Sequence, residues 1–186
     1  MRKVVLNLAV SLDGFIEGPN GEIDWCIMDD EMNFDTFVDS IDTIFYGRVS
    51  YDAWGNFRPQ EHTSPPDKID WQKIHSKHKI VFSSHNRVDD RAVFISSDIA
   101  NRVGELKKQS GKDIWLYGGA NLIKTFVHLE LIDIYKISIH PIALGSGKPL
   151  FEGLTNRLNF RLLNTRAFKS GVVEMTYGRE KPECQL

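Results

Sequence analysis

The sequence of 186 residues contains only two cysteines, Cys26 and Cys184, which lie far apart and have no metal-ligand spacing. We therefore expect neither a disulfide framework nor a zinc site. The six histidines lack such a spacing as well. His75 and His78 are three residues apart but have no further ligands nearby, so we expect both on the surface and predict no metal.

An excess of charge of one sign and a long apolar run are also missing. The formal net charge is −2, which gives no general attraction to nucleic acid or to an anionic membrane. The apolar run 4–10 is too short to span a membrane, and no small-residue cleavage site follows it. We expect a reduced, cytoplasmic protein with a single domain over residues 1–186, long enough to bury a substantial core.

The sequence does contain apolar, strand-like runs that alternate with helical segments. We predict strands over 4–10, 43–46, 80–82, 92–95, 113–117 and 134–140, helices over 29–40, 98–110 and 122–131, and a helix start at 47–51. Residues 11–21 and 141–151 are expected to be loops, 56–68 a long excursion, and 160–168 with 172–177 a closing antiparallel hairpin. This order predicts an α/β fold, in which a mainly parallel sheet is covered on both faces and made mixed by the hairpin.

The stretch 113–122 is the most informative part of the chain. An apolar run ends at Gly118 and Gly119, and an amphipathic segment follows at once. This pattern predicts a strand, a tight turn and a helix N-terminus, whose unpaired N–H groups and dipole favour an anion such as a pyrophosphate. A turn without any ligand is the alternative interpretation.

Two further strand ends carry similar chemistry. Residues 47–50 (Gly-Arg-Val-Ser) follow one predicted strand, and Ser83-Ser84 follow another. Ligands of parallel sheets bind beyond the carboxyl ends of the strands, so we expect these two segments to converge with the Gly118-Gly119 turn at one edge.

Four segments then resemble a known family, in family order: 8–14 (LAVSLDG), 44–48 (IFYGR), 116–122 (LYGGANL) and 141–151 (PIALGSGKPLF). The sequence is similar to the reductase domain of the bifunctional riboflavin-biosynthesis deaminase–reductase, which shares the dihydrofolate reductase fold. The resemblance implies a three-layer α/β/α architecture with an eight-stranded, mainly parallel mixed sheet. It also implies an NADPH site and a homodimer.

The resemblance assigns the cofactor site residue by residue. It implies that the turn holds the pyrophosphate and that the adenosine 2′-phosphate lies near the serine pair, with Arg48 or Arg87 supplying positive charge. Alternatively, these arginines are solvated and the serine pair is only a strand-end turn. The implied cofactor residues are Ala9, Gly47, Arg48, Ser50, Ser83, Ser84, Gly118, Gly119, Ala120, Asn121 and Leu122.

The substrate side is assigned in the same way. Asp13 corresponds to the loop beside the nicotinamide, and Asp30 follows Trp25 at the distance of the carboxylate that holds the pteridine in dihydrofolate reductases. A buried carboxylate with a raised pKa would help to protonate substrate. Phe34 and Trp25 would face the ring, and Lys148 would meet an acidic substrate.

Structural interpretations of the same residues stay open. Asp13-Gly14 suits a turn, and Asp29 and Asp30 suit a helix cap and first turn. The aromatic residues are candidates to line a pocket for a planar substrate, although most of them suit an ordinary core; they are Trp25, Phe34, Tyr51, Trp54, Trp71 and Trp115.

Two positions depart from the family. Asn7 and Phe15 are neutral where riboflavin-pathway reductases have lysine and arginine, so the native substrate need not be the phosphorylated pyrimidine. We predict an NADPH-dependent reductase of a small planar heterocycle, resembling 5-amino-6-(5-phosphoribosylamino)uracil reductase. A dihydrofolate reductase and a non-catalytic nucleotide-binding module are the alternatives.

Overall fold

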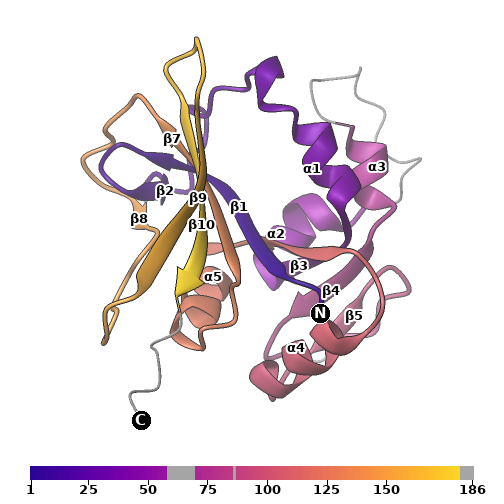
Figure 1. Cartoon of the computed structure of the whole chain (residues 1–186). Coiled ribbons are helices and arrows are strands. Elements are labelled where there is room, and N and C mark those ends of the chain that lie inside the picture. Colours follow the sequence, from indigo (N-terminus) through magenta and orange to yellow (C-terminus); the bar gives the residue numbers. More distant parts are fainter. Residues whose placement is uncertain (58–69, 86, 181–186) are drawn as a thin grey trace.

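The computed structural model describes residues 1–57, 70–85 and 87–180 (Figure 1). The strands are β1 (Val4–Ser11), β2 (Phe15–Glu17), β3 (Ile41–Gly47), β4 (His78–Phe82), β5 (Val93–Ile95), β6 (Asp113–Gly118), β7 (Ile134–His140), β8 (Lys148–Pro149), β9 (Asn159–Ala167) and β10 (Val173–Glu180). The helices are η1 (Asp30–Met32), α1 (Phe34–Ser40), α2 (Arg48–Ser50), η2 (Tyr51–Gly55), α3 (Trp71–His75), α4 (Ile99–Lys108) and α5 (Ala120–His128).

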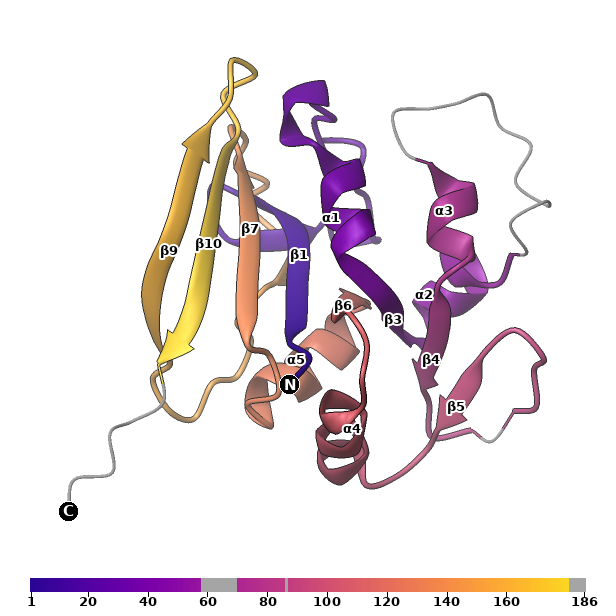
Figure 2. The same ribbon diagram turned by 45° about the vertical axis from the view of Figure 1, so that its right-hand side comes forward.

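Eight strands form one mixed sheet in the order β5-β4-β3-β6-β1-β7-β10-β9. The first six are parallel to one another, and β10 pairs antiparallel with both β7 and β9. Figure 2 shows the β9–β10 hairpin at one end of the sheet and β5 at the other. The predicted fold class is therefore confirmed, including the closing hairpin.

Side chains alternate between the two faces of the sheet along each strand, and helices cover both faces of its parallel part. Leu6 of β1 and Leu116 of β6 pack with Val103 of α4 and Phe126 of α5 on one face. On the opposite face, Trp115 belongs to a second buried cluster, together with Phe37 of α1, Ile74 of α3 and Ile44 of β3. These two clusters make the three layers that the resemblance implies.

The predicted helix over 29–40 is wrong in its first half. Residues Asp30–Met32 form a short 3-10 turn, and helix α1 begins only at Phe34. Asn33 between them has a left-handed backbone (φ 50°, ψ 47°), which interrupts the helix. The acidic pair therefore precedes α1 instead of capping it.

The predicted loops 11–21 and 141–151 each contain a short strand. Phe15–Glu17 and Lys148–Pro149 pair antiparallel as β2 and β8 and form a small second sheet. Segments of two or three residues are too short to show a strand pattern in the sequence. Most of the predicted excursion 56–68 lies outside the described residues. Helix α3 follows this stretch and is an element that the sequence analysis does not predict. It buries His75, which is 3% exposed and stacks on Trp71. The prediction of His75 on the surface is wrong, whereas His78 is exposed.

No helix in the described ranges has both the length and the apolarity that crossing a membrane requires.

Candidate functional site

The glycine turn lies where the sequence places it, between β6 and α5. Gly118 has φ +121°, a region that side chains other than glycine rarely adopt. Gly119 is the N-cap of α5, and its carbonyl accepts hydrogen bonds from Leu122 N and Ile123 N (2.9 and 3.0 Å). The helix begins at Ala120, two residues earlier than predicted. The first turn of α5 therefore directs its N–H groups to the carboxyl edge of the sheet.

The end of β3 meets this turn, because β3 and β6 are neighbouring parallel strands. A β-carbon at Gly47 would lie 3.4 Å from the Gly119 nitrogen and 3.6 Å from Cβ of Leu122. A β-carbon at Gly119 would lie 3.0 Å from the Ser50 hydroxyl oxygen. The predicted convergence of these residues is confirmed. The absence of side chains at Gly47 and Gly119 brings the Ser50 hydroxyl close to the N-terminus of α5. A hydroxyl and the first amides of a helix are donors that fit a pyrophosphate.

The serine pair and the two candidate arginines lie beside this edge. Ser83 Oγ accepts the His85 N–H at 3.1 Å, so it closes a turn after β4. Arg87 donates to the Asp52 carboxylate at 2.6 Å, and Arg48 lies 3.5 Å from the other oxygen of the same group. Both guanidinium groups that are candidates for the 2′-phosphate thus share one carboxylate.

A cavity of about 500 Å³ opens on the α1 face of the sheet. Asn7 and Ala9 of β1 contribute to its floor, and Tyr117 of β6 lines it next to Gly118. The segment before α1 forms one wall, and aromatic residues of η2 and α3 form another. The lining therefore reaches the residue that precedes the glycine turn. The volume of the cavity is typical of small-molecule sites.

His140, at the end of β7, is the cavity's only described imidazole. The residue is 2% exposed, and its Nδ1 accepts the Ile27 N–H at 3.1 Å. Burial lowers the pKa of His140. The neutral ring therefore carries its proton on Nε2, where it is a hydrogen-bond donor.

Of the predicted substrate residues, Phe34 lines the cavity. Trp25 is not among the described residues of the lining, but its ring packs edge-on against the ring of His140, with 5.5 Å between the centroids. Lys148 lies in β8, where it forms an ion pair with Glu17, and it is not among the described residues of the lining.

The three acidic residues in question have different positions. Asp13 accepts hydrogen bonds from Ser11 Oγ (2.6 Å), Gly145 N (2.7 Å) and Leu144 N (3.1 Å), so it ties two loops together. These donors lower the pKa of Asp13 to about 2. Asp29 lines the cavity. The side chain of Asp30 lies outside the described part of the structure, and its role stays a prediction.

Sequence reasoning named the tryptophans as possible pocket residues but favoured an ordinary core for most of them, and it missed the polar residues of β7. Trp54 and Trp71 stack at 5.8 Å and line the cavity together with Trp115. Ser138 and His140 of β7 line it from the sheet. A usable signal was present: Lys136, Ser138 and His140 alternate with apolar residues in a strand that was expected to be buried on both faces.

Within residues 1–57, 70–85 and 87–180, no three His, Cys, Asp or Glu side chains gather closely enough to hold a metal ion.

Comparisons with known proteins agree with this geometry. The fold is that of dihydrofolate reductase-like proteins: the structure of Enterococcus faecalis dihydrofolate reductase, solved with NADP(H) and RAB-propyl, matches with a TM-score of 0.64 at 15% identity, covering 96% of this chain and 97% of that one. A candidate riboflavin biosynthesis protein of Shewanella sp. PV-4 matches with a TM-score of 0.76 at 24% identity, over 97% of this chain and 100% of that one.

The family model of the RibD C-terminal domain matches residues 2–174, and the chain belongs to this family. Among relatives, the uncharacterized protein YyaP of Bacillus subtilis (strain 168) is 53% identical over 177 residues, which are 95% of this chain and 94% of YyaP.

Proposed function

We propose that this protein is an NADPH-dependent reductase of a small planar heterocycle. The observation that carries the proposal is that two sites lie next to each other at the end of β6. Tyr117 lines the cavity, and the next two residues form the glycine turn against Gly47 and Ser50. A phosphate-binding turn beside an aromatic cavity is the arrangement that brings a dinucleotide and a planar substrate together.

The residues present suit such a cofactor. Gly47 and Gly119 let the end of β3 lie close to the start of α5, where the helix N-terminus and the Ser50 hydroxyl are donors that suit a pyrophosphate. When bound, the nicotinamide would supply the hydride. Arg48 and Arg87 are the cations available to a 2′-phosphate beside Ser83 and Ser84.

The chain itself would orient the substrate and exclude water. The stacked Trp54 and Trp71 and the ring of Phe34 give a planar molecule flat contacts. The Nε2–H of His140 and the hydroxyl of Ser138 offer fixed polar contacts. Orientation of this kind is the main contribution that a protein makes to cofactor chemistry.

The test is NADPH oxidation by the purified protein with a panel of pyrimidines and pterins, using two matched glycine variants. Gly47→Ala puts a methyl group over the Gly119 amide, and we expect NADPH affinity to fall on the order of tenfold. Gly104→Ala in α4 is the control, because a β-carbon there meets nothing within 4 Å. NADPH affinity that is unchanged in Gly47→Ala, or a panel without any turnover, would contradict the proposal.

A dihydrofolate reductase is the second candidate, and Asp29 supports it. Its carboxylate lines the cavity four residues after Trp25. Dihydrofolate therefore belongs in the panel, and its turnover would have to depend on Asp29 or Asp30.

The homodimer and the cytoplasmic location that we expect from the sequence remain proposals. Sedimentation of the purified chain tests the first, and cell fractionation tests the second.

A further inference from the structure

We propose that the cavity selects a planar heterocycle that carries no phosphate group. This inference rests on the proposed function and names the class of substrate for that same site. The charge of the lining, the pairing of the surrounding cations and the shape of the walls each support it.

The lining has carboxylates and no described cation. Among the described residues that line the cavity there is no lysine and no arginine, whereas Asp29 and Asp35 are both present. Cys26 and His140 add no negative or positive charge, because burial raises the pKa of the Cys26 thiol to about 11 and lowers that of His140. A phosphate would therefore lose its hydration and meet like charge without gaining a counter-charge.

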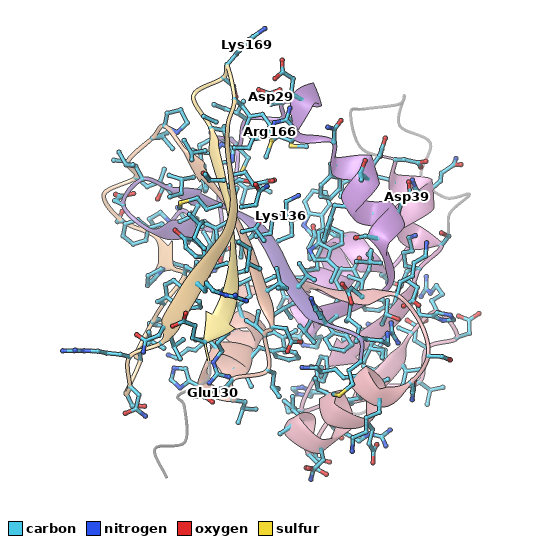
Figure 3. All side chains as sticks on the ribbon, viewed as in Figure 1. Asp29, Asp39, Glu130, Lys136, Arg166 and Lys169 are labelled. Carbon is cyan, nitrogen blue, oxygen red and sulfur yellow. The ribbon has the colours of Figure 1, made fainter. Side chains whose placement is uncertain are left out.

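Among the described residues, cations of β7, of α3 and of the β9–β10 hairpin have carboxylate partners. Lys136 of β7 lies on the face of Ser138 and points toward α1 (Figure 3). Its ammonium group is 3.2 Å from Glu174 and lies over the ring of Phe37 at 5.7 Å. This pairing neutralises the lysine next to the cavity floor.

Three further cations in the described part of the chain also have carboxylate partners. Arg166 and Lys169 of the hairpin lie 3.9 and 4.0 Å from the carboxylate of Glu31, in the segment that also carries Asp29 (Figure 3). Lys73 of α3 is 2.6 Å from Asp39. A phosphate tail leaving the cavity on these sides would compete with a carboxylate for each of these cations.

The walls favour a flat ring over a flexible sugar phosphate. Phe34, Trp54, Trp71, Trp115 and Tyr117 supply most of the described aromatic surface of the lining. Hydrogen-bonding groups come from the sheet, as the side chains of Asn7, Ser138 and His140. A ring with a few edge donors and acceptors satisfies both kinds of contact.

The experiment compares matched pairs of probes that differ only in phosphate. One pair is 5-amino-6-(5-phosphoribosylamino)uracil and its dephosphorylated form, and the other is dihydroneopterin with and without its triphosphate. Binding to the protein saturated with NADPH is followed by tryptophan fluorescence, and turnover by NADPH oxidation. We expect the phosphate-free member of at least one pair to bind about tenfold more tightly.

Asp35→Lys is the diagnostic variant, because it puts a cation into the lining, and it is expected to remove most of this preference. Glu105→Lys makes the same charge change on α4, where Glu105 pairs with Arg102 at the surface, and is expected to preserve it. If Asp35→Lys does not fold, Asp35→Asn is expected to reduce the preference in part.

The outcomes separate this inference from the proposed function. Phosphorylated probes that bind as tightly or more tightly overturn the inference, even if NADPH is oxidised. Selective binding of the phosphate-free probes without NADPH oxidation supports the inference and counts against the reductase. A cavity that binds none of the four probes contradicts the inference, since each carries the ring that it requires.

Discussion

At the residue scale, Asp13 belongs to a motif with an expected functional role and also links two loops through hydrogen bonds. The resemblance gives it a place beside the nicotinamide, and the structure gives it three hydrogen-bond donors from two loops. Leu12 N and Leu150 N add backbone bonds between the same loops, to Ile142 O and Gly14 O. A carboxylate held in this way positions the loops, and it is poorly suited to accept a proton near neutral pH.

A pH-dependent loss of stability follows for Asp13. The hydrogen bonds from Ser11 and then Gly145 lower the pKa in the folded state to about 2, below the ordinary value of 3.8. The stabilisation is therefore complete above the ordinary value and disappears as the pH falls through the folded value. In urea unfolding, Asp13→Ala is expected to be less stable than the wild type near neutral pH, with a difference that shrinks between about pH 4 and pH 2.

A difference that stays constant over this range would mean that the charge of Asp13 plays no part. The hydrogen bonds of an uncharged side chain would then account for the link between the loops.

The residues that could be predicted are those that sit in a local pattern. Gly118, Gly119 and Gly47 are recognisable because a turn and a close backbone approach need glycine, and Ser50 follows from its helix start. By residue type Trp54 and Trp71 suit a pocket or a core, and only the tertiary packing shows that they line the cavity, as Asp29 also does. The polar alternation of β7 was the one local sign of the cavity floor.

At the scale of elements, strands were easier to predict than helix boundaries. Buried parallel strands show as continuous apolar runs, so β1, β3, β6 and β7 were all recognised. Helix α5 begins two residues before its predicted start, because its first residues are also part of the glycine turn. Helix α1 was started too early, because the acidic pair resembles a cap. The pairing of β2 with β8 depends on contacts between distant loops, which sequence patterns do not record.

The α2–η2 segment carries a prediction about cofactor choice. Asp52 lies one turn after Arg48 and binds both Arg48 and Arg87, the two candidate cations for a 2′-phosphate. Its charge would repel that phosphate and compete for the same guanidinium groups. Asp52→Asn is expected to tighten NADPH binding about two- to fivefold, the size of an exposed ion pair of up to about 1 kcal/mol. NADH binding is expected to stay the same.

Fluorescence titration at low and high salt measures this effect, which salt should reduce. Asp90→Asn is the control, because it removes a carboxylate from the nearby 87–91 segment. The Asp90 carboxylate lies 3.8 Å from Arg91, which is not a candidate for the 2′-phosphate. Tighter binding of both cofactors in Asp52→Asn, or weaker binding of NADPH, would be inconsistent with competition for the 2′-phosphate.

At the scale of the whole molecule, the parallel sheet explains why the two halves of the site meet. The carboxyl ends of β1, β3, β6 and β7 share one edge, so a turn after β6 and a cavity over β1 and β7 become neighbours. The mixed sheet and the three layers agree with the dihydrofolate reductase-like fold and the RibD C-terminal domain family. The described lining of the cavity has two carboxylates and no lysine or arginine, whereas a phosphorylated substrate would need a cation there.

The most direct test of the account is a titration of the purified protein with NADPH, with NADH in parallel, followed by tryptophan fluorescence. Trp54, Trp71 and Trp115 line the cavity and provide the signal. We predict saturable quenching by NADPH, with a dissociation constant at least about tenfold below that for NADH. Quenching by neither nucleotide would contradict the account, and the glycine turn would then be a purely structural feature of the fold.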